Sequence, residues 1–332
     1  MAEALSLVRK HSTIPAFDPE EVNVFDFHYR EIPFAELSMT ILLGTGASGS
    51  VYKGRWRNAL VAIKQITISA SNSIQSIRSE LQIMTSLGNH PNIIPLIGAC
   101  TTQQDSIYTV LKFCEKGSLY EYLIEKMTKI TNDQLSTILQ SSAFALEFLH
   151  SKNIVHRDIA ARNFLLASPF NDYLADFGLS RLVVSDDGTQ QTQTSYGPLR
   201  WMAPESIFNK EYSTKSDCYM YAMFLYEVLF RKVPFFETPN ILDVTELVAA
   251  GERPKILDGD LQPIYLDIFR SCWCSDPADR LTMCEIRIRW INFFQTSSEP
   301  FQKDSMQQLP STTLSTIEVH YGDATDAADA YS

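Results

Sequence analysis

Two short segments near the middle of the chain constrain its fold and chemistry more than any other feature. Residues 156–163 read His-Arg-Asp-Ile-Ala-Ala-Arg-Asn, and residues 176–178 read Asp-Phe-Gly. Phosphoryl transfer from ATP needs a carboxylate beside the acceptor hydroxyl and oxygen ligands that hold Mg²⁺ on the phosphates. Asp158 can serve the hydroxyl, and Asn163 and Asp176 can hold the metal. Both segments, in this order, predict a phosphoryl-transfer site.

A glycine-rich segment lies upstream, with the spacing Gly-x-Gly-x-x-Gly-x-Val over residues 44–51. Glycines let the backbone N–H groups approach phosphate oxygens closely. The spacing alone also fits a dinucleotide-binding turn, but that turn opens into a helix. Strand-like residues follow here, which favours a hairpin. The predicted nucleotide-binding residues of this loop are Gly44, Thr45, Gly46, Ala47, Ser48, Gly49 and Val51.

Residues 61–64 read Val-Ala-Ile-Lys, an alternating strand that ends in a lysine. An isolated strand lysine is usually a solvated surface charge. Combined with the glycine-rich loop and the two polar segments, however, this strand resembles part of a eukaryotic protein kinase of the tyrosine-kinase and tyrosine-kinase-like group. The resemblance covers roughly residues 41–291.

The resemblance implies an α+β, bilobal fold with a small β-rich N-lobe and a larger helical C-lobe. We expect an N-terminal leader (1–37), an N-lobe (38–114), a C-lobe (115–295) and an acidic tail (296–332). Strand-like residues dominate 38–68 and 107–113, with a break at Arg57-Asn58, while apolar residues at helical spacing predict helices. The predicted helices span 71–87, 119–126, 133–150, 215–230 and 243–250.

The leader and the tail read differently from the rest. Pro15, Pro19 and Pro33 interrupt the leader, which we expect to be partly flexible and to dock near its end through aromatic residues between 25 and 34. The tail is polar and predicted to be disordered. It could be a docking or autoinhibitory peptide with Tyr321 as a phosphosite, although a dispensable solvated end is favoured.

The resemblance also implies how ATP is bound. Lys64 would hold the α- and β-phosphates, and Glu80 is its expected ion-pair partner. Leu111 would guard the back of the nucleotide pocket. Cys114 is either a reachable thiol at the pocket edge or, as favoured, an inert half-buried cysteine. The remaining predicted nucleotide-contacting residues are Ala62, Lys112, Phe113 and Leu165.

For catalysis the resemblance implies that Asp158, Lys64, Asn163 and Arg162 carry the reaction. Arg157 would meet a phosphorylated residue of the activation loop, which runs from Asp176 to Glu205. Asp217 would anchor the catalytic segment, and Arg280 would pair with Glu205. The possible phosphate acceptors of the loop are Thr189, Thr192, Thr194, Ser195 and Tyr196. Tyr219, Ala222 and Leu281 depart from the usual kinase residues.

Substrate class is a separate question. Ala160 stands where serine/threonine kinases usually have lysine, and Arg162 stands where tyrosine kinases have arginine. Residues 198–205 resemble the tyrosine-kinase platform, but Tyr196-Gly197 does not fit the usual approach to it. These features favour tyrosine or dual specificity over serine/threonine specificity alone, which stays an alternative. A pseudokinase is disfavoured because the expected catalytic residues are all present, and the platform disfavours a small-molecule kinase.

Composition narrows the partners and the compartment. The net charge of −11 argues against nonspecific nucleic-acid binding, since a phosphate backbone attracts basic surfaces. The six cysteines show no zinc or disulfide spacing, and neither a signal peptide nor a membrane span is visible. We expect a cytoplasmic enzyme that uses ATP with Mg²⁺, or alternatively Mn²⁺, on protein substrates. An adaptor or an upstream kinase would be a further partner.

Overall fold

The computed structural model describes residues 27–46, 49–69, 73–168, 170–183, 189–191, 198–256 and 261–296, and of 189–191 only the backbone. The chain divides into two compact units. The first comprises Met1–Asn89 and Ile94–Cys114, and the second comprises His90–Ile93 and Glu115–Ser332.

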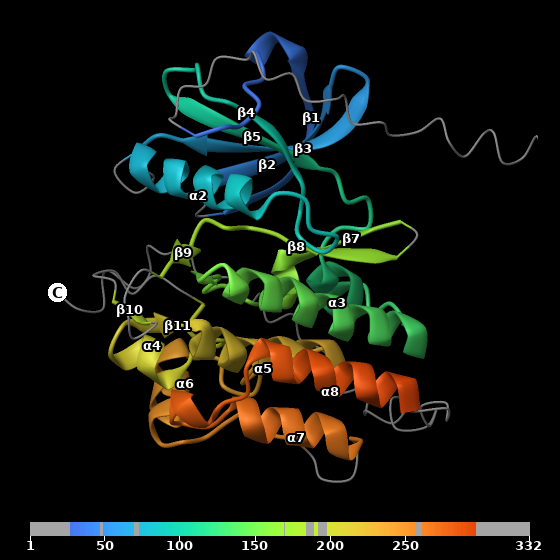
Figure 1. The fold of residues 1–332 in the computed structure, drawn as a ribbon, viewed down its shortest axis with the longest axis vertical. Helices are drawn as coiled ribbons and strands as arrows, with labels where there is room; N and C mark the ends of the chain where they lie inside the picture. The colour runs from blue at the N-terminus through green and yellow to red at the C-terminus, as the bar shows by residue number, and fades with distance from the viewer. Residues whose placement is uncertain are drawn as a thin grey trace, which may run out of the picture. The chain divides into compact units, whose positions relative to one another are not determined.

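The first unit is built on a five-stranded antiparallel sheet in the order β1-β2-β3-β5-β4 (Figure 1). Its core contains Trp56, Val61 and Ile63 from β2 and β3, packed with Tyr108 and Val110 from β5. The predicted break is present as a turn at Arg57-Asn58, where Arg57 has a φ of 52°. The strands are β1 (Leu37–Gly46), β2 (Gly49–Trp56), β3 (Ala59–Thr67), β4 (Leu96–Cys100) and β5 (Ser106–Lys112).

Helix α2 (Ile74–Leu87) belongs to the same unit and packs on the sheet through an apolar face that includes Ile77 and Leu81. It begins later than the predicted residue 71 because Ser73 caps it, accepting a hydrogen bond from the Ser76 N–H. It ends at Gly88, whose φ of 58° glycine adopts without strain.

The segment before β1 is packed into the first unit. Glu31 forms a parallel bridge with Ala99 of β4, and Tyr29 is buried against Ile77 and Leu81 of α2. A short 3₁₀ turn, η2 (Phe34–Glu36), follows. The expected docking of the end of the leader is therefore seen, with Tyr29 buried and Phe27 packed against the same cluster. Residues 1–26 lie outside the described part.

The second unit is mainly helical. Helix α5 (Thr214–Phe230) is its centre, because every side chain from Ser216 to Leu229 is buried. Helices α3 and α8 run side by side in Figure 1, joined by an ion pair of 2.9 Å between Glu147 and Arg287. The helices are α3 (Asn132–Ser151), α4 (Pro204–Phe208), α5, α6 (Ile241–Ala249), α7 (Pro263–Cys272) and α8 (Met283–Thr296).

Three of the predicted helices of this unit are confirmed to within about two residues as α3, α5 and α6. The helix expected at 119–126 is instead a short π-helical segment, η3 (Glu121–Glu125), in which the Lys126 N–H donates to the Glu121 carbonyl oxygen at 2.8 Å. Prediction from apolar spacing cannot separate one such turn from an α-helix.

Small two-stranded sheets and 3₁₀ turns carry the polar segments of the second unit. The paired strands are β6 (Ile154–Val155) with β9 (Arg181–Leu182), β7 (Phe164–Ala167) with β8 (Asn171–Leu174), and β10 (Thr189–Gln191) with β11 (Glu211–Ser213). The turns are η4 (Ala161–Asn163) and η5 (Pro277–Asp279).

These observations confirm the predicted α+β class, with a strand-rich first unit and a helical second unit. Among the described residues, the helices are all too short or too polar to cross a membrane. The tail beyond residue 296 lies outside the described part, so its predicted disorder stays a prediction.

Candidate active site

The glycine-rich loop is the hairpin between β1 and β2. Gly46 pairs with Gly49, whose φ is 122°. A Cβ at Gly49 would lie 2.3 Å from the Gln65 carbonyl oxygen, so only glycine fits there. Ala47 and Ser48 lie outside the described residues. The hairpin predicted from the strand-like residues after the loop is therefore confirmed.

Lys64 and Glu80 form the predicted ion pair. The Lys64 ammonium lies 2.7 Å from Glu80 Oε1, and both residues are buried. Strand β3 supplies the lysine and helix α2 the glutamate, and Val51 of β2 lies opposite Lys64 in the sheet. A buried ammonium keeps its charge when a carboxylate is close. This pair can present a fixed positive charge beside the glycine-rich loop.

The end of β5 carries Leu111 and Lys112, two of the residues predicted to contact the nucleotide. Leu111 pairs with Ala62 of β3 in the sheet, so the two side chains are neighbours on one face of it. The Lys112 N–H donates to the Pro95 carbonyl oxygen at 3.1 Å, so that donor is already used. Cys114 is 8% exposed, which favours an inert cysteine. Leu165 belongs to the second unit, in β7.

In the second unit, Asp217 of α5 holds the backbone of the segment that precedes Asp158. Its two carboxylate oxygens accept the N–H groups of His156 at 2.7 Å and Arg157 at 2.9 Å, which confirms the predicted anchoring. Arg157 has a φ of 68°. A left-handed backbone at a non-glycine residue costs about 1–3 kcal/mol, and these two hydrogen bonds offset that cost.

His156 joins this segment to the one that contains Asp176. The Asp158 N–H donates to Nδ1 of His156 at 3.3 Å. Nε2 must then carry the ring proton, which it donates to the Ala175 carbonyl oxygen at 3.2 Å. His156 is fully buried, so its imidazole is a structural link between the two polar segments.

Asp158, Arg162 and Asn163 are brought together by the 3₁₀ turn η4. The Arg162 guanidinium donates to Asp158 Oδ1, and the Asn163 amide nitrogen donates to the Asp158 carbonyl oxygen at 2.7 Å. The Ala175 N–H donates to the Asn163 carbonyl oxygen at 2.8 Å. Asp176 is the next residue in the chain, so this hydrogen bond holds its backbone near Asn163. The turn therefore holds the Asp158 carboxylate beside the Arg162 guanidinium. Asn163 and Asp176, which could offer oxygen ligands to a metal, lie close by.

The donor set suits a hard divalent cation. The amide nitrogen of Asn163 is used by the Asp158 carbonyl, which leaves the amide oxygen for another contact. Asp176 adds a carboxylate and has a φ of 58°. Carboxylate and amide oxygens are the ligands that Mg²⁺ and Mn²⁺ prefer. Asn163 and Asp176 could therefore hold such an ion.

Arg157 lies near the cation Arg181, the aromatic ring of Tyr212 and the carboxylate of Asp217. Its guanidinium lies 4.3 Å from the ring centroid of Tyr212 in β11. Burial, together with the nearby charge of Arg181, lowers the pKa of Arg157 to about 10. Two guanidiniums that repel each other favour an anion close by. The activation-loop acceptors Thr192, Thr194, Ser195 and Tyr196 lie outside the described residues, as does the side chain of Thr189.

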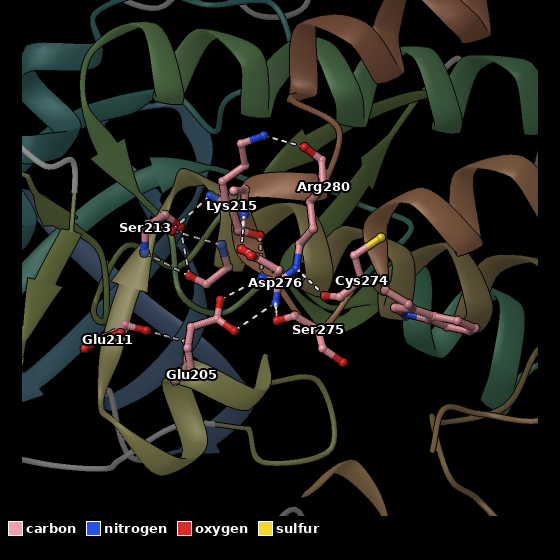
Figure 2. A network of polar contacts seen from close by, with 12 residues as sticks. Glu205, Glu211, Ser213, Lys215, Cys274, Ser275, Asp276 and Arg280 are labelled. Atoms are coloured by element: carbon pink, nitrogen blue, oxygen red, sulfur yellow. Dashed lines mark hydrogen bonds and ion pairs between the residues drawn. The ribbon is translucent and has the colours of Figure 1, made fainter. Parts of the chain in front are cut away.

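Glu205 and Arg280 form the second predicted ion pair, a two-point contact of 2.6 Å and 2.8 Å (Figure 2). Arg280 also donates to the carbonyl oxygens of Cys274, Lys215 and Ser275. Figure 2 shows these groups converging on the guanidinium between α4 and the start of α5. The pair holds the end of the activation segment on the helical unit.

The platform at 198–205 is tied down by residues for which the sequence suggested no contacts. Arg200 donates to the carbonyl oxygens of Phe235 at 2.9 Å and Thr238 at 2.8 Å. Glu227 of α5 accepts a hydrogen bond from the Trp201 indole at 2.9 Å. The only sequence signal for Glu227 was a carboxylate within an otherwise apolar helical stretch.

Comparison with known proteins agrees with this geometry. Residues 37–289 match the family model described as protein tyrosine and serine/threonine kinase. The match covers most of the chain, so the chain belongs to this family, as the sequence motifs predicted. It contains a protein kinase domain.

Curated relatives carry both specificities. A probable serine/threonine-protein kinase of Dictyostelium discoideum is 33% identical over 260 residues, 77% of this chain and 28% of the relative. The tyrosine-protein kinase transforming protein Abl of Abelson murine leukemia virus is 30% identical over 270 residues, which make up 81% of this chain and 36% of the relative. The human tyrosine-protein kinase TXK is 31% identical over 264 residues, which make up 79% of this chain and 49% of the relative. The chain thus spans less than half the length of each of these relatives.

Proposed function

We propose that this protein is an active, ATP-dependent protein kinase that phosphorylates protein hydroxyls in intracellular signal transduction. The observation that carries the proposal is the arrangement around η4, where Asp158 is paired with Arg162 and joined through Asn163 to the Asp176 segment. Family membership supports the same conclusion. The kinase domain would occupy 38–295, between a leader (1–37) and a tail (296–332).

Each predicted residue has a role in this proposal. Asp158 accepts a hydrogen bond from the acceptor hydroxyl and orients it, while most of the acceleration comes from positioning and charge neutralisation. Asn163 and Asp176 hold Mg²⁺, which when bound neutralises charge on the phosphates. Lys64, fixed by Glu80, contacts the α- and β-phosphates. The glycine-rich loop and the residues at 111–114 with Leu165 border the nucleotide.

Tyrosine or dual specificity is the favoured substrate class. Arg162 contacts both Asp158 and the Trp201 ring, at 4.8 Å from its centroid, so it links the proposed catalytic carboxylate to the platform at 198–205. A lysine at position 160 would favour serine and threonine, and Ala160 occupies that position instead. Because relatives of both kinds are about equally similar, serine/threonine specificity is the alternative.

A pseudokinase scaffold is the less favoured alternative. Pseudokinases usually lose the strand lysine, the catalytic aspartate or the metal-binding aspartate, whereas Lys64, Asp158, Asn163 and Asp176 are all present in this chain. Arg157 would bind a phosphorylated activation-loop residue, which makes an upstream kinase, or the enzyme itself, the activator. We also propose that the protein is cytoplasmic and that an adaptor recruits it.

A transfer assay tests it. Purified protein is incubated with radiolabelled ATP, Mg²⁺ and a mixed peptide pool, and the labelled residues are identified by phosphoamino-acid analysis. Label on tyrosine that disappears in Asp176→Ala supports the favoured class. Label on serine and threonine alone overturns the specificity. Absence of label, after treatment with activating kinases as well, contradicts the kinase activity.

A further inference from the structure

Glu227 is a buried carboxylate outside the set of proposed catalytic residues. It lies within α5 and is 1% exposed. Its Oε2 accepts two hydrogen bonds, from the Ala161 N–H at 2.8 Å and from the Trp201 indole N–H at 2.9 Å. Ala161 directly precedes Arg162, and Trp201 belongs to the platform. One oxygen therefore joins two loops that are distant in the sequence.

The two groups that Glu227 holds are the two supports of Arg162. The first is the backbone at the start of η4, which carries Arg162. The second is the Trp201 indole, over which the guanidinium lies at 4.8 Å. From there Arg162 reaches the Asp158 carboxylate. The contacts close a circuit from Glu227 through Trp201 and Arg162 and back through Ala161.

We infer that Glu227 is a positioning residue for phosphoryl transfer, which fixes Arg162 through Ala161 and Trp201 and thereby holds the Asp158 carboxylate toward the acceptor hydroxyl. This inference rests on the role proposed for Asp158. Glu227 itself would not contact the substrate. Its loss should therefore slow the transfer step and weaken peptide binding at the platform, while ATP binding in the first unit stays unchanged.

Stability alone does not explain a glutamate at position 227. Burying a carboxylate is costly, and Oε1 of Glu227 has no hydrogen-bond partner among the described residues. Burial raises the pKa of Glu227 to about 7, with Asp158 adding to the shift, while the donors Ala161 and Trp201 and the charge of Arg162 oppose it. An apolar side chain would avoid this cost but could not hold both donors.

Two variants test the inference. Trp201→Phe keeps a ring beneath Arg162 but lacks the indole N–H, and Glu227→Gln keeps an acceptor oxygen but lacks the charge. Each should lower kcat for peptide by about 10- to 100-fold, the size expected for a small misplacement of reacting groups. The dissociation constant of ATP should change less than about twofold. The double variant should be little worse than the worse single one, because both act through the same circuit.

Trp290→Phe is the matched control. Trp290 is also fully buried, and its indole donates to the Tyr221 hydroxyl at 2.9 Å, outside this circuit. Both tryptophan variants should lower the unfolding temperature, but only Trp201→Phe should lower kcat. Equal kcat values for the two would overturn the inference, as would strictly additive effects in the double variant. If the parent protein transferred no phosphate to peptide even after treatment with activating kinases, the proposed function would fail. The inference would then fail with it.

Discussion

At the scale of single residues, the burial of Arg280 determines how much its ion pair with Glu205 contributes to stability. The guanidinium is fully buried, whereas the Glu205 side chain is 11% exposed. Removing one partner of a buried pair leaves an uncompensated charge and costs about 3–5 kcal/mol. Glu205→Ala should therefore destabilise the protein by roughly that amount in urea unfolding.

The exposed ion pair between Glu237 and Lys255 is the control for this prediction. Its two side chains are 54% and 81% exposed, and a solvated pair contributes about 0–1 kcal/mol. Glu237→Ala should be nearly neutral. A loss of similar size for the two variants would mean that burial of Arg280 does not dominate.

Asp172 of β8 gives a prediction about pH. It is fully buried, Ser141 donates to its Oδ1, and its Oδ2 has no hydrogen-bond partner among the described residues. Burial raises its pKa to about 7 from an ordinary value of 3.8. The folded protein thus keeps a proton that the unfolded chain releases, and its stability falls as pH rises through this window.

Asp172→Asn removes that titration. The stability of the variant relative to the parent should rise between pH 5 and pH 8, by at most about 1.4 kcal/mol per pH unit. Urea unfolding of both proteins across this range measures the difference. Parallel curves would contradict a neutral Asp172 in the folded state.

The sequence predicted the residue pairs for which the family motifs specify both members, such as Lys64 with Glu80. It did not predict the contacts of Glu227. Its two donors are a backbone N–H and an indole from loops distant in the sequence, and no pattern of residue types records such a contact. Ala47 and Ser48 lie outside the described residues, and the nucleotide contacts of the whole glycine-rich loop stay predictions.

At the scale of elements, the segment before β1 acts as an added edge strand. The Ile32 N–H donates to the Ala99 carbonyl oxygen at 2.7 Å, and the Ala99 N–H donates to the Arg30 carbonyl oxygen at 2.9 Å. Gly98 of β4 permits this approach, because a Cβ there would lie 2.6 Å from the Arg30 carbonyl oxygen. The close contact is the reason for glycine at this position.

Gly98→Ala should therefore displace residues 30–32. We expect a loss of about 1–3 kcal/mol, typical of overpacking, and faster hydrogen exchange at the Ile32 amide. Gly44→Ala is the control, since a Cβ at Gly44 meets nothing within 4 Å. Unchanged protection of the Ile32 amide in Gly98→Ala would show that the segment does not depend on this contact.

Helix predictions succeeded for the two long helices α3 and α5, although α5 is buried on every side. Helix α3 shows one apolar face and a Thr131–Gln134 capping box, and both its ends were predicted within one residue. Helix α7 was not predicted, although Pro263 stands at its first position, where proline is favoured, and Tyr265, Ile268, Phe269 and Cys272 recur at helical spacing on its buried face. Docking of the leader through its aromatic residues was predicted, but the sequence did not specify that Tyr29 would pack on α2.

At the scale of the whole molecule, the two units divide the proposed chemistry. The first carries Lys64, Glu80 and the glycine-rich loop, and the second carries Asp158, Asn163 and Asp176. This division predicts that nucleotide affinity and phosphate transfer respond to different substitutions. In the proposed mechanism, binding of ATP would depend largely on the first unit, whereas the orientation of the acceptor hydroxyl would depend on Asp158.

The most direct test is to measure ATP affinity and transfer rate side by side for the parent and Asp158→Asn. The substitution keeps the size of the side chain and removes its charge. We predict an unchanged dissociation constant for ATP, within about twofold, and a transfer rate lower by about 10³-fold or more, as expected for the loss of a residue that orients the nucleophile. A variant that keeps a substantial part of the parent rate would show that Asp158 does not carry the reaction.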